Sequence, residues 1–64
     1  MAYEKATIIG TSTESFTAAA DDAIDRAEER FDDVKWAETS IRGVELATVD
    51  DREYQVEAVV AYRA

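Results

Sequence analysis

The 64-residue sequence contains no cysteine, no histidine and no proline, and only two of its residues are glycine. The lack of cysteine excludes disulfide bonds, and the lack of both cysteine and histidine excludes zinc sites of the usual kind. The same two absences remove the commonest general base and the strongest nucleophile, so little supports an enzyme. The 15 acidic residues match neither a calcium-binding loop nor a phosphate-binding loop. Weak binding of cations by clustered carboxylates is the one metal chemistry that stays open.

Basic residues are also scarce. Seven of them face 15 acidic residues, which gives a net charge of −8. This charge repels the phosphates of nucleic acids and of anionic membranes, so neither is an expected partner. Many acids with only two lysines, Lys5 and Lys35, suggest a halophilic protein that works in strong salt, and an ordinary acidic protein is the alternative. No apolar run reaches the length of a membrane span and no signal peptide is visible, so a cytoplasmic location is expected.

The length allows one domain, residues 1–64, with one modest core. A domain of this size usually needs a disulfide, a metal or a partner subunit. With the first two excluded, we predict a homo-oligomer, and a marginally stable monomer is the alternative. A predicted helix strengthens this prediction because its apolar stripe is mostly alanine, which buries little surface. The stripe recurs at helical spacing and consists of Phe16, Ala19, Ala20, Ala23, Ile24, Ala27 and Phe31.

The order of the elements follows from turn signals and periodicity. A β-branched run predicts a first strand over Tyr3–Thr11. The following segment, 11–14, has the pattern of a capping box, in which Thr11 would cap the helix and Glu14 would reach back, with Ser12 as a rival cap. The helix should end between Phe31 and Asp33.

Two long strands should complete the fold. They are predicted over Val34–Leu46 and Arg52–Arg63, joined by a short polar connection over Ala47–Asp51. At Gly43 the apolar pattern shifts by one residue, which indicates a β-bulge. The predicted fold class is therefore α+β, with the order β-α-β-β and the helix across one face of a three-stranded antiparallel sheet.

Alternation assigns the strand residues to the two faces of the sheet. In the second strand, Val34, Trp36 and Glu38 should share one face, and Ala37, Thr39 and Ile41 should share the face toward the helix. In the third strand, the helix side should carry Tyr54, Val56, Ala58, Val60 and Tyr62. The opposite side should carry Gln55, Glu57, Val59, Ala61 and Arg63. A monomer would leave Trp36, Val59 and Ala61 exposed, which favours association.

Trp36 and Gln55 are the candidate ligand-binding residues. Both are predicted on the sheet side away from the helix, where an indole and an amide suit a planar heteroaromatic ligand. The indole would stack on the ring, and the amide would offer one donor and one acceptor to its polar edge. The alternatives are a packing role for the tryptophan and simple solvent exposure for the glutamine.

These residues belong to a longer pattern. It comprises Gly10-Thr11-Ser12, Ser15-Phe16, the alanine-rich helix through Ala27, Trp36-Ala37-Glu38, Arg42-Gly43 and Tyr54-Gln55-Val56. Over its whole length the chain resembles the dodecin family, and the helix segment is most similar to archaeal members.

The resemblance implies properties that periodicity does not show. It implies a three-stranded antiparallel sheet wrapped around one helix, assembly into a hollow homododecamer, and flavin pairs bound at two-fold interfaces. Trp36 would stack on the flavin, and Gln55 would hydrogen-bond the edge of the isoalloxazine ring. The implied role is flavin storage and photoprotection without catalytic turnover.

The resemblance also places Arg42, Val44 and Glu45 in the binding site and leaves the flavin open. Archaeal members often carry an acidic residue where this chain has Ile41, so a metal beside the flavin is in doubt. The Ile-Arg-Gly run resembles bacterial members, which favour FMN, whereas Glu45 resembles archaeal ones. Arg42 could pair with a phosphate, stack over the ring, or remain an exposed cation. Riboflavin and FMN both stay open.

Two other functions compete with flavin binding. A structural or interaction protein would use Trp36 at a subunit contact and would bind no ligand. An enzyme using a carboxylate pair is the last alternative, since the sequence defines no constellation for it.

Overall fold

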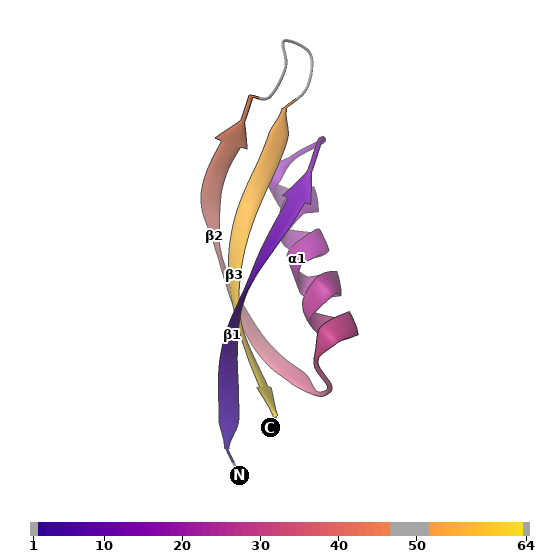
Figure 1. The fold of residues 1–64 in the computed structure, drawn as a ribbon, viewed down its shortest axis with the longest axis vertical. Helices are drawn as coiled ribbons and strands as arrows, with labels where there is room; N and C mark the ends of the chain where they lie inside the picture. Colours follow the sequence, from indigo (N-terminus) through magenta and orange to yellow (C-terminus); the bar gives the residue numbers. More distant parts are fainter. Residues whose placement is uncertain (1, 47–51, 64) are drawn as a thin grey trace.

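The computed structural model describes residues 2–46 and 52–63, and Figure 1 shows their arrangement. The element order is the predicted β-α-β-β: β1 (Tyr3–Ser12), α1 (Phe16–Arg30), β2 (Val34–Glu45) and β3 (Glu53–Arg63). The predicted connection over 47–51 lies outside the described residues. In the part of the chain that is described, no helix is long and apolar enough to cross a membrane.

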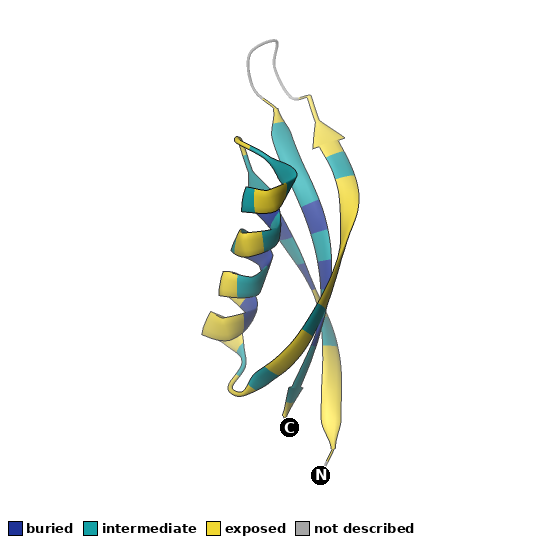
Figure 2. Cartoon of the chain, turned by 180° about the vertical axis from the view of Figure 1, so that it is seen from behind, coloured by how far each residue is buried: buried dark blue, intermediate teal, exposed yellow. Residues whose placement is uncertain are grey.

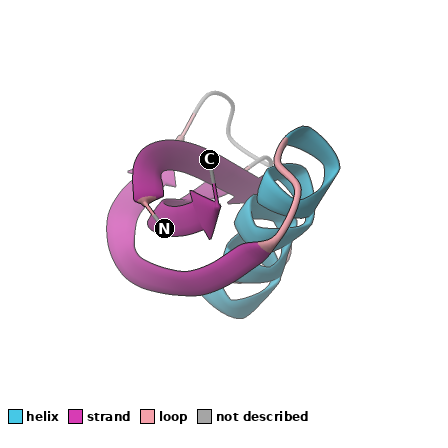
Figure 3. Cartoon of the chain, turned by 90° about the horizontal axis from the view of Figure 1, so that it is seen from below, coloured by secondary structure: helices cyan, strands magenta, loops and turns pink. Residues whose placement is uncertain are grey.

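The sheet confirms the predicted α+β class. Its strand order is β1-β3-β2, and both pairings with the central strand β3 are antiparallel. The sheet is strongly twisted and curls beside α1, which lies along one of its faces (Figures 1 and 3). We call the face away from α1 the outer face; on β3 it carries the alternating residues Gln55, Glu57, Val59 and Ala61, as predicted.

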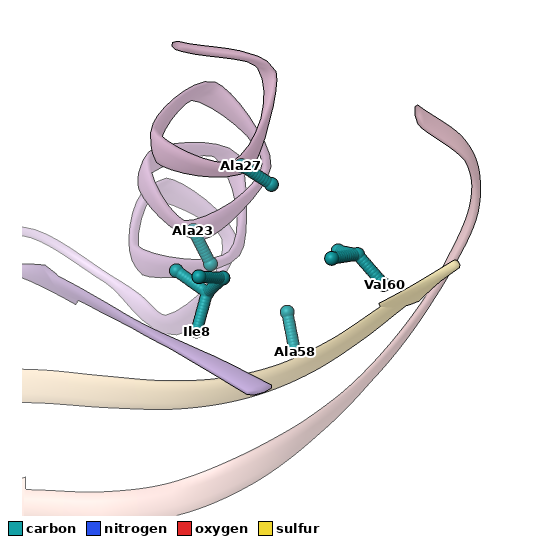
Figure 4. Packing of buried hydrophobic residues seen from close by; sticks show 5 residues of the cluster. All are labelled: Ile8, Ala23, Ala27, Ala58 and Val60. Carbon is teal, nitrogen blue, oxygen red and sulfur yellow. The ribbon is translucent and has the colours of Figure 1, made fainter. Parts of the chain in front are cut away.

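The core is built from small side chains. The three helix residues that are fully buried are all alanine, Ala19, Ala23 and Ala27. Ala23 and Ala27 form one core cluster with Ile8, Ala58 and Val60 (Figure 4), and the buried stripe of the helix faces the sheet (Figure 2). Among the residues that the structure describes, Val60 is the largest side chain that is completely enclosed. Such a core removes little apolar surface from water, which agrees with the expectation of a thin core in the isolated chain.

Aromatic pairs join the two ends of α1 to the central strand. At the start of the helix, Phe16 meets Tyr54 edge to face with ring centroids 5.0 Å apart. Just beyond its end, Phe31 stacks on Tyr62 at 4.0 Å. The half-buried rings add apolar contact on either side of the alanine stripe, so the helix is fixed at both ends as well as along its length.

The start of the helix differs from the prediction. The N-cap is Ser15, whose Oγ accepts a hydrogen bond from the backbone N–H of Ala18 at 3.0 Å. The predicted capping box over 11–14 is wrong because β1 continues through Ser12, whose Oγ accepts from the N–H of Glu14 in a tight turn. The N–H of Thr11 is donated to Asp22 instead. Ser15 has the extended backbone that a cap needs, and it lies four residues after the predicted cap Thr11 and three after its rival Ser12.

Two bulges in β2 set the direction of its side chains. The register slips between Val34 and Trp36 and again between Ile41 and Gly43. The second slip is the predicted bulge, and Gly43 there has φ +149°, a conformation that side chains disfavour. The first slip was not predicted. It turns Val34 toward the core with Ala37, so the prediction that Val34 shares a face with Trp36 is wrong.

The carboxylate of Asp22 fixes α1 to the end of β1. Its Oδ2 accepts from the backbone N–H of Thr11 at 2.9 Å and from Arg26 Nε at 2.9 Å. The Thr11 hydrogen bond is the main reason that the pKa of Asp22 lies below its usual value of 3.8, and Arg26 lowers it further. The contact therefore stabilises the fold in the ionised form of the carboxylate.

Replacing Asp22 with alanine is expected to lower the free energy of unfolding by about 1–3 kcal/mol at neutral pH, since hydrogen bonds to a charged group are lost. A folded-state pKa below the unfolded value means that this stabilisation is complete above about pH 3.8 and disappears as the pH falls through the folded-state pKa. Urea unfolding of wild type and variant at neutral pH and near pH 3 measures both effects. Asp21→Ala, an exposed neighbour, is the control. An equal gap between wild type and Asp22→Ala at the two pH values would contradict the assignment.

Candidate functional site

The tryptophan of the chain is a surface residue. Trp36 is 50% exposed and lies opposite Ala61 in the β2–β3 ladder. Directly opposed residues in a ladder share a face, so the indole lies on the outer face and not beneath α1. The bulge before Trp36 explains how the chain places Val34 in the core and an indole on the surface only two residues later.

An ion pair lies next to this bulge. Lys35 Nζ is 2.9 Å from Asp33 Oδ1, and Arg63 contacts the other carboxylate oxygen at 3.7 Å. The hydrogen bond from Lys35 lowers the pKa of Asp33, and the same bond raises the pKa of Lys35. Asp33 also adopts a left-handed backbone, with φ 56°, as the chain turns from α1 into β2. The charged turn thus leads directly into the strand that carries the indole.

Gln55 lies at the other end of the outer face and is the centre of a polar network. Its Oε1 accepts from Arg42 Nε at 3.0 Å. Its Nε2 donates to Glu45 Oε2 at 3.1 Å and to Glu53 Oε1 at 3.0 Å. An amide nitrogen has two hydrogens, so both are engaged by carboxylates of the same chain. Within one protomer, Oε1 is therefore the atom of this amide that can still accept a hydrogen bond from a ligand.

A shallow, open depression of about 530 Å³ surrounds this amide at the end of β2. It is lined by Arg42, Gly43, Val44, Glu45 and Gln55. The structure therefore brings together four of the five residues predicted for the site. The side chains of Val44 and Glu45 lie on opposite faces of the sheet, because Val44 is paired with Tyr54 and Glu45 is paired with Glu53.

Trp36 does not join this cluster within one protomer. It is opposite Ala61, which is six residues along β3 from Gln55, a separation of about 20 Å at the usual rise of a strand. The indole and the amide share a face but not a site. Only a second copy of the chain could place an indole beside the depression.

Sequence reasoning missed Glu53, which completes the network from the start of β3. The feature that could have indicated this role is the register of the β2–β3 hairpin, which places Glu53 directly opposite Glu45. Like charges in that position repel unless a donor lies between them, and the Gln55 amide supplies that donor. Over residues 2–46 and 52–63, no group of three or more acidic side chains is arranged to hold a metal ion.

Comparisons with known proteins place these features in a family. A family model described as Dodecin matches residues 2–64. The structure of a dodecin from Streptomyces davaonensis is similar with a TM-score of 0.84 at 30% identity, covering 98% of this chain and 93% of that one. The tt0972 protein from Thermus thermophilus has a TM-score of 0.77 at 37% identity, with coverage of 98% and 93%.

A third similar structure is a single-substitution variant of the Thermus thermophilus dodecin, with a TM-score of 0.81 at 33% identity and coverage of 98% and 94%. No curated protein sequence matches the chain at a significant level.

Proposed function

The chain belongs to the dodecin family, and from this membership we propose that it is a flavin-binding storage protein rather than an enzyme. The single observation that carries the proposal is the half-exposed indole of Trp36 on the outer face. A tryptophan side chain is normally buried over most of its surface. A flat ligand ring stacked on the indole would cover it.

The proposed site forms between copies of the chain. Since Trp36 and Gln55 are about 20 Å apart in one protomer, a flavin in contact with both must lie at an interface. A two-fold axis would bring the indole of one copy beside the amide of the other and would repeat the site for a second flavin. We propose that two flavins stack between two such indoles within a homododecamer.

Arg42 would distinguish the two candidate flavins in this proposal. A guanidinium has five N–H donors, and the bond from Nε to Gln55 uses one of them. A terminal phosphate such as that of FMN could accept further hydrogen bonds from the same side chain. Riboflavin lacks that phosphate and would depend on stacking and on Gln55, so the ratio of the two affinities reports the role of Arg42.

The proposal is tested by titrating riboflavin and FMN with the purified protein and measuring the flavin fluorescence, with the mass of the same sample determined by size exclusion. We expect yellow protein, strong quenching by the nearby indole, and a mass of about twelve copies. Arg42→Met is the matched variant, and it should weaken FMN more than riboflavin. An assembled but colourless protein that binds neither flavin would contradict flavin binding and support the alternative of a structural protein with Trp36 at a subunit contact.

The charge of the chain leads to a further expectation for the assembly. Each copy has a net charge of −8, so an assembly of twelve concentrates like charges that only salt can screen. We propose that the assembly is adapted to high salt. Size exclusion in dilute buffer should show dissociation, and molar salt should restore the large particle. A particle mass that is the same in both buffers would contradict this adaptation.

A further inference from the structure

The hydrogen bonds around Gln55 fix which way its amide points. Arg42 donates toward one side of the amide group, and two carboxylates accept on the other. If the amide were turned over, its NH₂ group would meet the guanidinium donor and its carbonyl would meet the carboxylates. Both contacts would then be repulsive, so the neighbours allow only one of the two orientations.

The position of the two carboxylates strengthens this constraint. Glu45 and Glu53 are directly opposed in the β2–β3 ladder, where like charges are unfavourable. The Gln55 NH₂ group donates to both and thereby bridges them. Turning that NH₂ group toward a ligand would leave two facing carboxylates without their shared donor, whereas using the free lone pair of Oε1 would disturb neither.

We infer that Glu53, together with Arg42, positions the Gln55 amide so that it meets a ligand as a hydrogen-bond acceptor, and that the site therefore selects rings whose edge carries an N–H donor. The inference rests on the proposed function, since it concerns the ligand of that site. Glu53 is a positioning residue here: it contacts Gln55, but it is not among the residues that line the depression.

The flavin ring has an edge that meets this requirement. The pyrimidine part of isoalloxazine carries one N–H between two carbonyl groups. The N–H can donate to Oε1 of Gln55, whereas a carbonyl finds no donor on this amide while both hydrogens of Nε2 are held. Methylation of that nitrogen removes the donor and leaves the stacking surface of the ring in place.

The experiment compares the dissociation constants of lumiflavin and 3-methyllumiflavin, measured by fluorescence quenching. The wild type should bind the methylated ring at least about tenfold more weakly, since its acceptor is left unpaired. The ratio of the two dissociation constants in Gln55→Ala, which has no amide at this position, measures how much the bulk of the methyl group alone weakens binding. Glu53→Met frees one hydrogen of Nε2 for a ligand carbonyl and should move the ratio most of the way to the Gln55→Ala value.

Glu53→Gln is the conservative control, because its side-chain carbonyl can still accept from Nε2 without a charge. It should keep the wild-type ratio, which a purely electrostatic role of Glu53 would not predict. Equal weakening of both flavins by Glu53→Met would overturn the inference while leaving the proposed function intact, and so would an unchanged ratio in Gln55→Ala. Failure of the wild type to bind either flavin would contradict both. Melting temperatures and size exclusion verify that each variant is folded and assembled.

Discussion

Replacing Gly10 with alanine should destabilise the protein more than any other single methyl group added to its core. A Cβ at this position would lie 2.1 Å from the backbone oxygen of Ala19 and 2.5 Å from the backbone nitrogen of Ala23. Gly10 is thus the point where β1 touches the helix itself. Because the clashing atoms are backbone, no rotamer change relieves them, and the helix must move away from the sheet.

That movement would separate the alanine stripe from the sheet. Overpacking usually costs about 1–3 kcal/mol, and we expect the upper end or more here, against a total stability of roughly 3–10 kcal/mol for a chain of this length. Urea unfolding at fixed salt and protein concentration measures the loss. Gly43→Ala is the matched control, since a Cβ there meets nothing within 4 Å. Its positive φ adds only backbone strain of about 1–3 kcal/mol.

A second substitution identifies the clashing atoms. Ala23→Gly removes the Cβ of Ala23, which would lie 2.6 Å from the new methyl group, but leaves both backbone atoms in place. The double variant should therefore remain as unstable as Gly10→Ala, or become less stable because glycine weakens a helix. Full rescue by Ala23→Gly would show that only the side chain was crowded, and would contradict the close backbone approach.

Replacing Trp36 with alanine should abolish most of the flavin affinity while leaving the fold intact. The indole is half exposed and lies outside the core, so its removal should change the stability of the folded protomer by about 0.5 kcal/mol or less. Loss of one stacked ring costs about 1–3 kcal/mol by analogy with bases stacked on aromatic residues. The dissociation constant should therefore rise by about fivefold to more than a hundredfold.

Fluorescence titration of Trp36→Ala and Trp36→Phe separates stacking from other effects. Phenylalanine keeps a flat ring on the same strand and should retain a larger part of the affinity than alanine. Quenching of the bound flavin should fall in both variants, because the electron-rich indole is gone. An affinity for flavin that does not change in Trp36→Ala would rule out stacking. A wild type that binds no flavin, together with loss of the assembly in Trp36→Ala, would instead favour the structural alternative.

Much of the protomer was predictable because its patterns are local. The period-two alternation of β3 identified the residues that face α1, and the structure buries Val56, Ala58 and Val60 as expected. The glycine at the phase shift of β2 indicated a bulge there, which the register confirms. In each case a strand places alternate side chains on opposite faces, so the sequence carries the answer within a few residues.

The errors arose where several local solutions competed. Serine and threonine at 11, 12, 13 and 15 are all acceptable N-caps. Ser15 is the cap because β1 continues through Ser12, where its pairing with Tyr54 ends. The bulge before Trp36 has no glycine to mark it, so the inward turn of Val34 had no local signal. Pairing with β3 decided both outcomes.

The sequence by itself determined the element order, the alanine stripe, the excess of acidic groups, and the choice of Trp36 and Gln55 as ligand-binding candidates. Only the tertiary structure decided how these residues are related in space. It placed Trp36 and Gln55 on one face but at opposite ends, and it enclosed the Gln55 amide among Arg42, Glu45 and Glu53. The reason is that such relations depend on strand register and on two bulges, and register is set by the pairing of residues far apart in the sequence.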